Sequence, residues 1–269
     1  MSVTDVIETP KYRTKIIKAG ALLTDTRSFF TYWDRALSRK QNLEHLQTSN
    51  VAAKDTRTRS EVVLAIFRQR YLADPEIAKA LATFVNERAS ARILTPIFYF
   101  HAAQNDALLH DLVTEFLAPM QWQGHAEVTT EQVVGFLFEQ VRARRTATSW
   151  SKPTARRVAQ GLLATLRDFG ILSGAMGSRK KYFTPMYLPI ESFAYVAFLL
   201  NRRLRSGELL LSSNEWQLFF LSRQLVERYF IEAESHRLLT YNAAGSIIRV
   251  DFPTESIEEY AHTLAQRAH

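Results

Sequence analysis

Helix-start signals followed by apolar side chains at helical spacing recur along most of this sequence. Asp74-Pro75 pairs a favoured N-cap residue with a proline suited to the first helical position, and apolar residues then repeat every three or four positions over 77–85. Thr95-Pro96 repeats the same device ahead of the apolar run 97–100. Capping boxes are expected at Thr58-Arg-Ser-Glu61, Thr129-Thr-Glu-Gln132 and Ser212-Ser-Asn-Glu215. This repetition predicts a mainly α protein.

The composition bounds what such a helical chain can do. The 269 residues are 46% apolar, which is enough for one large domain or two to three small ones with buried cores. The absence of cysteine excludes a disulfide scaffold, a thiolate metal site and a cysteine nucleophile. The seven histidines are scattered, and lone residues such as His101 and His125 are expected to be structural. We therefore expect no metal and no cofactor.

The most apolar stretch, 193–200, is eight residues long and is bounded by Glu191 and Arg202. A helix that spans a bilayer needs about 20 apolar residues, so this stretch predicts a buried helix. The polar, mixed-charge N-terminus lacks the pattern of a signal peptide. A soluble, cytoplasmic protein without a membrane partner is expected.

The order of predicted elements divides the chain into three segments. Residues 1–105 are expected to form an N-terminal helical bundle, 106–190 a basic module, and 191–269 a C-terminal helical region with a small β-hairpin around Asn242-Ala-Ala-Gly245.

Several local expectations belong to these segments. Helices are expected over 12–23 and 28–37, with the aromatic residues of the second in the core: Phe29, Phe30, Tyr32 and Trp33. A helix over 108–117 is expected to stop at Pro119. A long helix is expected to run from the Ser212 capping box to about Glu234, and a closing helix to cover 255–268.

Positive charge is concentrated in one window of the middle segment. Residues 142–181 carry ten basic side chains against the single acid Asp168, a net charge of +9, whereas the whole chain carries +7. Clustered lysine and arginine are typical of proteins that bind polyanions, although a solvated basic face is the commoner reason for a charge run. The local architecture of the window favours a polyanion.

That window contains the element order of a winged helix-turn-helix. The helix opened by Thr129 is followed by a polar break, and a second helix from Thr154 carries an apolar stripe over 158–169 and ends at Gly170. Short strands at 171–172 and 182–184 flank a Gly-rich basic loop. In such folds the second helix enters the major groove and the wing contacts the backbone. The sequence thus predicts a DNA-binding module.

The candidate contacts lie where this module needs positive charge or hydrogen-bond donors. Most are expected to bind phosphates, which position a protein without reading sequence. In the basic module they are Arg142, Arg144, Arg145, Ser149, Ser151, Lys152, Thr154, Arg156, Arg157, Arg179, Lys180 and Lys181, and a second patch would comprise Lys11, Arg13, Lys15 and Lys18.

Catalytic signatures are missing from the sequence. It contains no phosphate-binding loop, GxGxxG, HExxH or GxSxG motif. His110, Asp111 and Glu115, together with Asp106, could form an acidic helix face whose carboxylates would suit a metal nuclease, but such a face is far more often simply solvated. A non-enzymatic protein without a small-molecule substrate is expected.

Four stretches of the first half resemble one known family. They are Tyr12-Arg-Thr-Lys-Ile-Ile-Lys-Ala-Gly-Ala-Leu-Leu, Gln41-Asn-Leu43, Thr56-Arg-Thr-Arg59 and Arg68-Gln-Arg-Tyr-Leu72. With the element order, they are similar to the BrxA family of BREX phage-resistance systems. The resemblance implies a bacterial defence component that binds double-stranded DNA, with an N-terminal bundle like that of the antitermination factor NusB. Two alternatives stay open: an adaptor or scaffold that docks other proteins of the defence system, and an RNA-binding protein.

Overall fold

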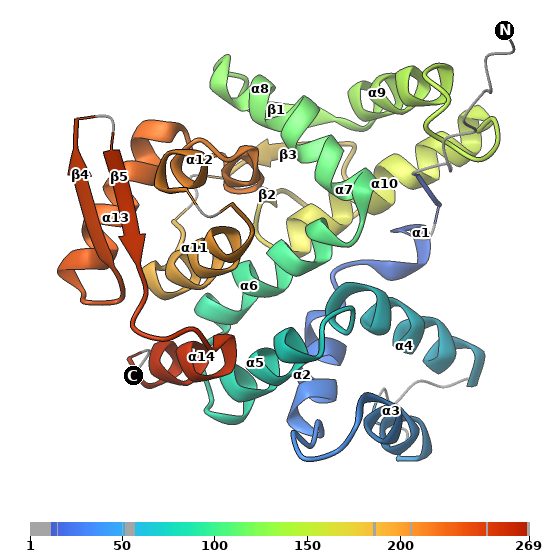
Figure 1. The fold of residues 1–269 in the computed structure, drawn as a ribbon. Helices are drawn as coiled ribbons and strands as arrows, with labels where there is room; N and C mark the ends of the chain where they lie inside the picture. The colour runs from blue at the N-terminus through green and yellow to red at the C-terminus, as the bar shows by residue number, and fades with distance from the viewer. Residues whose placement is uncertain are drawn as a thin grey trace, which may run out of the picture. The chain divides into compact units, whose positions relative to one another are not determined.

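The chain is mainly helical with small antiparallel sheets, and it forms two compact units (Figure 1). The computed structural model describes residues 12–14, 16–49, 51, 57–184, 187–204, 206–245 and 247–267. Unit 1 comprises Met1–Gly20 and Ala107–Thr184, and unit 2 comprises Ala21–Asp106 and Pro185–His269. The expected first and last segments thus share unit 2 over most of their length. Their division into three independently folding domains stays a prediction.

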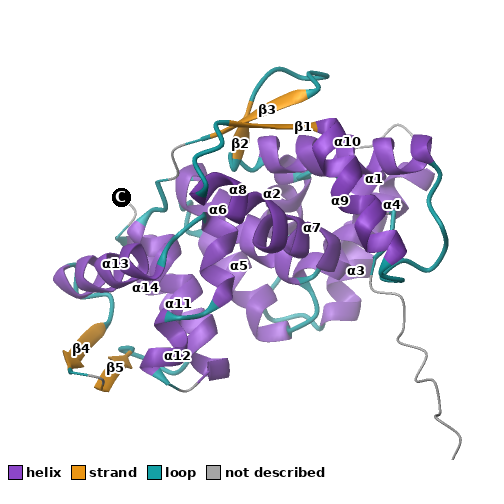
Figure 2. Ribbon diagram, turned by 90° about the horizontal axis from the view of Figure 1, so that it is seen from above, coloured by secondary structure: helices purple, strands orange, loops and turns teal. Residues whose placement is uncertain are grey.

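Unit 1 combines helices with a three-stranded antiparallel sheet (Figure 2). Its elements are α1 (Ile16–Ala19), α7 (Ala107–Asp111), the π-helix η1 (Leu112–Leu117), α8 (Ala118–Trp122), β1 (Glu127–Thr129), α9 (Thr130–Arg142), α10 (Lys152–Asp168), β2 (Leu172–Ser173) and β3 (Lys180–Phe183). The sheet order is β1-β3-β2. The expected helix–helix–hairpin sequence is therefore present, and β1 adds a strand to it.

The capping signals of α9 and α10 explain where these helices begin. The Thr129 hydroxyl accepts from the backbone N–H of Gln132, and the Gln132 side chain accepts from that of Thr129, so the expected capping box is confirmed. α10 begins two residues earlier than expected because Ser151 serves as its N-cap. Its apolar stripe over 158–169 is buried, as expected.

α1 packs closely on α10 within unit 1. A Cβ atom at Gly161 would lie 3.2 Å from the Ile16 carbonyl oxygen, so glycine permits this close approach. The expected helix over 12–23 is wrong in extent. α1 ends at Ala19, because Gly20 and Leu22 adopt left-handed backbone conformations that stop the helix.

Unit 2 is a helical assembly with one β-hairpin. Its elements are α2 (Leu23–Thr31), α3 (Arg39–Thr48), α4 (Arg57–Tyr71), α5 (Pro75–Asn86), α6 (Ala91–Gln104), α11 (Ile190–Leu204), α12 (Gly207–Leu211), the 3₁₀-helix η2 (Asn214–Phe219), α13 (Arg223–Ser235), β4 (Thr240–Ala244), β5 (Ile247–Asp251) and α14 (Ile257–Gln266). α11 contains the apolar run expected to be a buried helix. No helix within the described ranges is long and apolar enough to cross a bilayer.

Aromatic side chains form much of the core of unit 2. Phe30 contacts Phe67, Tyr71 and Phe98, with ring centroids 5.0 to 6.0 Å apart. Of the four aromatic residues expected in this core, Phe29, Phe30 and Trp33 are buried. Tyr32 is the exception, since it follows the end of α2 and is 54% exposed.

Of the three proline-based helix boundaries, the one at Asp74-Pro75 is confirmed, because the Asp74 side chain accepts from the Glu76 backbone N–H and Pro75 is the first residue of α5. The other two differ from the expectation. α6 begins at Ala91, and Pro96 lies inside it, because burial of most of the helix outweighs one lost backbone hydrogen bond. Pro119 does not end its segment either. It lies in the first turn of α8, where a missing N–H is tolerated, and the π-helix η1 joins α8 to α7.

Three further boundaries were wrong. Thr58 lies within α4, so it is not an N-cap. The long helix expected after Ser212 is split, because Phe220 adopts a left-handed conformation after η2 and Ser222 then caps α13. In the C-terminal hairpin the strands pair up to Ala244 opposite Ile247, so the turn is shorter than expected.

Candidate nucleic-acid interface

The N-terminal end of α10 carries exposed cations next to two hydroxyl groups that are already hydrogen-bonded within the protein. Ser151 and Thr154 lie 3.0 Å apart, oxygen to oxygen, and Ser151 also accepts from the Thr154 backbone N–H, so both hydroxyls serve the cap. Lys152 and Arg157 are exposed and form no ion pair within the described part of the chain. Ser149 is exposed in the preceding loop. Among these residues, the two cations are the best placed to meet an anion.

The hairpin between β2 and β3 brings Arg179 to the beginning of α9. The Arg179 carbonyl oxygen accepts from the Thr130 backbone N–H at 2.8 Å and from its hydroxyl at 3.2 Å. The Arg179 side chain is exposed. The backbone thus fixes the basic end of the hairpin against one helix of the predicted DNA-binding module.

Glu131 marks the point where three cations meet. Its carboxylate forms an ion pair with Arg156, and this hydrogen bond lowers the pKa of Glu131. Lys152 lies one helical turn before Arg156 on α10, and the Arg179 carbonyl oxygen is bonded to Thr130, the residue before Glu131. The charges of both cations lower the same pKa further. We call these four residues the Glu131 cluster. Cations from α10 and from the hairpin therefore converge, and one carboxylate partly neutralises them.

The other two lysines of the hairpin have protein partners. Lys180 forms an exposed ion pair of 2.7 Å with Glu127 on the neighbouring strand β1. Lys181 is only 3% exposed, and its ammonium group donates to the carbonyl oxygens of Ala175 and Ser178 at 3.0 and 2.8 Å. Burial lowers the pKa of Lys181. The expectation that Lys181 presents its charge outward is corrected, because that charge lies inside the hairpin loop.

A second group of exposed cations lies near the C-terminal end of α9. Arg142 and Arg144 are exposed there, and neither forms an ion pair with any described residue. The backbone N–H of Tyr12 donates to the Arg145 carbonyl oxygen at 2.9 Å, which brings Arg13 to the same loop. Of the expected second patch, Lys11, Lys15 and the side chain of Lys18 lie outside the described residues.

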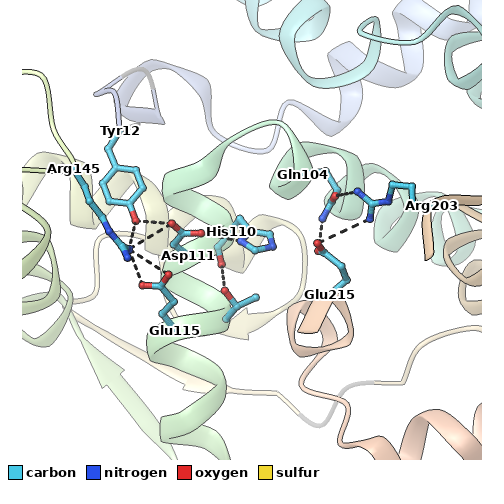
Figure 3. A network of polar contacts seen from close by, with 9 residues as sticks. Tyr12, Gln104, His110, Asp111, Glu115, Arg145, Arg203 and Glu215 are labelled. Atoms are coloured by element: carbon cyan, nitrogen blue, oxygen red, sulfur yellow. Dashed lines mark hydrogen bonds and ion pairs between the residues drawn. The ribbon is translucent and has the colours of Figure 1, made fainter. Parts of the chain in front are cut away.

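Arg145 belongs to a partly buried polar network of unit 1 (Figure 3). Its guanidinium group lies 2.9 Å from Glu115 and 3.7 Å from Asp111, and it donates to the Tyr12 hydroxyl at 3.0 Å. Tyr12 in turn donates to Asp111 at 2.6 Å. Burial raises the pKa of the Tyr12 hydroxyl, and its hydrogen bond to Asp111 raises it further. Arg145 therefore holds the N-terminal segment to α7 and η1, and it leaves the set of candidate DNA contacts.

The same network corrects the expectation of a solvated acidic face. Asp111 is 4% exposed and lies 2.9 Å from the His110 ring. Glu115 is exposed but paired with Arg145. Among the residues that the structure describes, no three histidine, aspartate or glutamate side chains are grouped so as to hold a metal ion.

Unit 2 holds a separate polar group around Arg203 (Figure 3). Arg203 donates to the Gln104 side chain at 3.0 Å, and Gln104 donates to Glu215. Nearby, His101 is buried and shares a hydrogen bond of 2.9 Å with the Tyr195 hydroxyl. Burial, with a smaller effect of Arg203, lowers the pKa of His101 to about 3. His101 is therefore neutral and structural, as expected, whereas His125 is exposed.

The acidic partners Glu127 and Glu131 are the residues that the sequence did not reveal. Each pairs with a cation more than twenty positions away, and the pairs depend on the register of β1 with β3 and on the packing of α9 with α10. The only signal in the sequence is that both acids closely flank the Thr129 cap, on the chain segment that opens the basic module.

Comparison with known families decides the affiliation of this chain. Residues 10–199, more than half of the sequence, match the family model of BrxA. The chain belongs to the BrxA family. BrxA proteins are components of BREX phage-resistance systems, so membership implies a role in this defence. A search of curated proteins gave no match to this BrxA-family chain.

Proposed function

We propose that this BrxA-family chain is a non-enzymatic component of its BREX system that binds double-stranded DNA, largely through the phosphate backbone. The observation that carries the proposal is the Glu131 cluster, in which Arg156 of α10 pairs with Glu131 while Arg179 of the hairpin is bonded through its backbone to the adjacent Thr130. Each cation that neutralises a phosphate releases condensed counterions, so converging cations favour a polyanion.

The local fold supports a duplex over a single strand. α9, α10 and the antiparallel strands β2 and β3 follow the element order of a winged helix-turn-helix, whose second helix enters the major groove. The aromatic cluster near the N-terminus offers no platform for stacking single-stranded bases, because three of its four residues are buried. Duplex DNA is therefore the ligand that we propose.

A competition experiment tests the ligand class. The full chain is bound to a labelled 30-base-pair duplex, and unlabelled duplex DNA, single-stranded DNA of the same sequence and double-stranded RNA are compared as competitors at equal nucleotide concentration. The proposal predicts that duplex DNA competes best. Equal or better competition by RNA would contradict it and favour the RNA-binding alternative.

A second experiment separates DNA binding from a purely adaptor role. Tagged protein is purified from cells that carry the complete defence system, with and without nuclease and 1 M salt. We propose that other proteins of the system are partners as well. If the chain retards no duplex but retains such a partner through both treatments, it acts as an adaptor and the DNA-binding proposal is overturned.

A further inference from the structure

The loop between β2 and β3 carries an apolar side chain at its exposed end. We call residues 174–179 the wing loop. Met176 lies in it and is 86% exposed, more than any other large apolar side chain among the described residues. Exposure of one methionine is unremarkable by itself. Its significance depends on how the loop is held and on what surrounds it.

Hydrogen bonds from a buried lysine side chain hold the wing loop. The buried ammonium group of Lys181 donates to three carbonyl oxygens, those of Ala175, Ser178 and Lys180, at 2.8 to 3.4 Å. Gly174 has a φ of +127°, and a Cβ atom there would lie 3.2 Å from the Lys180 carbonyl oxygen. A loop whose carbonyl groups are held by one internal cation presents the backbone of Met176 in a defined position, so the backbone would lose little conformational entropy on binding.

Positive charge surrounds the base of this loop. Arg179 ends the loop, and its backbone is bonded to Thr130 at the start of α9. Its charge acts on Glu131 together with those of Lys152 and Arg156. A rigid apolar tip on a cationic base suits a ligand with an anionic exterior and an apolar, stacked interior. Duplex DNA has this combination, and proteins that bind its minor groove insert methionine and other apolar side chains between base pairs.

We infer that Met176 is a wedge that enters the minor groove and partly unstacks one base step when the wing loop docks. This inference rests on the proposed function, because it requires duplex binding. Pyrimidine–purine steps unstack most easily, so TA steps are the expected position of insertion. The wedge adds an apolar contact to the binding by cations, and it bends the duplex.

The test compares Met176→Ala and Met176→Leu with the unmodified full chain. Binding is followed by anisotropy, and unstacking by the fluorescence of 2-aminopurine placed in the TA step of a short duplex. Ile247→Ala, which removes a 72% exposed side chain from β5 of unit 2, is the matched control. Thermal melts confirm that each variant is folded.

The wedge predicts a fluorescence increase with the unmodified chain, the Leu variant and the control, and its loss with Met176→Ala. The affinity of Met176→Ala should fall about tenfold, the effect of removing most of one buried apolar side chain. Its salt dependence should not change, since no phosphate contact is lost.

Three results would overturn the inference, and they are distinguishable. If the unmodified chain binds the duplex with steep salt dependence and Met176→Ala matches it in affinity and fluorescence, the wedge is wrong and the proposed function stands. If the unmodified chain does not bind the duplex, both fail. Loss of a co-purifying defence protein in Met176→Ala with unchanged DNA binding would assign the tip to a protein partner and also overturn the wedge.

Discussion

Arg144 is exposed and unpaired within the described chain, whereas its neighbour Arg145 is bound by Glu115 and Asp111. The difference follows from the backbone, because Arg144 adopts a left-handed conformation just after α9. The segment beginning at Tyr12 pairs with this loop on the side of Arg145. Two adjacent arginines thus have different roles, one available to a ligand and one structural.

This difference predicts that alanine at one position lowers stability and that alanine at the other weakens DNA binding. Arg145→Ala should lower the free energy of unfolding of unit 1 by about 2 kcal/mol, because the ion pairs of Arg145 with Glu115 and the buried Asp111 would be lost. The partial exposure of Arg145 keeps the loss below that of a fully buried pair. Arg144→Ala should leave stability unchanged and weaken duplex binding. Thermal melts and anisotropy titrations measure both. Equal melting temperatures would contradict the structural role of Arg145.

Local periodicity predicted much of the fold. The cap at Thr129, the apolar stripe of α10 and the closing helix α14 depend on residues close in sequence, so they could be predicted directly. The boundaries at Pro96 and Pro119 could not, because tertiary burial and a π-helix override the local preference against proline.

The candidate site was less predictable for a physical reason. A sequence shows how many cations a segment has, but the partner of each cation depends on contacts between distant residues. Lys180 pairs with Glu127, and Arg156 pairs with Glu131, only because strands and helices meet in the fold. The ammonium group of Lys181 donates hydrogen bonds to carbonyl groups of its own loop. A count of charges along the sequence cannot distinguish such a lysine from one on the surface.

The internal role of Lys181 gives a second prediction. Lys181→Met retains the aliphatic stem but removes the donor, so the carbonyl groups of the wing loop lose their partner. Hydrogen exchange should become faster over 174–183, by roughly tenfold if about 1.4 kcal/mol of local stability is lost. Lys180→Met, which removes an exposed ion pair, is the control and should leave exchange unchanged. Identical hydrogen exchange in the two variants would contradict the role of Lys181 in holding the wing loop.

Replacement of Glu131 is predicted to strengthen duplex binding. Glu131→Gln removes the only carboxylate of the Glu131 cluster and frees Arg156, so duplex affinity should rise roughly fivefold at 0.1 M salt. The slope of log affinity against log salt should become steeper by about 0.9, the value for one additional phosphate contact. Glu139→Gln, which neutralises an exposed acid on the same helix, is the matched control. Weaker binding by Glu131→Gln would show that the ion pair supports the site.

The buried histidine makes stability depend on pH. His101 has a pKa of about 3 in the folded protein and an ordinary value near 6.5 when unfolded, so below pH 6.5 the unfolded state binds the additional proton. Stability should therefore fall as the pH drops below 6.5, by at most about 1.4 kcal/mol per pH unit. His101→Gln keeps a polar partner for Tyr195 and should flatten the melting temperature between pH 7.5 and 5.5. An unchanged pH profile in this variant would contradict the assignment.

The most direct test of the central claim is the salt dependence of duplex binding. Within the described part of unit 1, six cations are exposed and form no ion pair: Arg13, Arg142, Arg144, Lys152, Arg157 and Arg179. If each neutralises one phosphate, log affinity should fall against log salt with a slope of roughly −5. In the variant that combines Lys152→Glu, Arg157→Glu and Arg179→Glu, affinity should drop by at least about a hundredfold at 0.1 M salt with an unchanged melting temperature. A flat salt response of the unmodified chain, or full binding by the triple variant, would contradict the account.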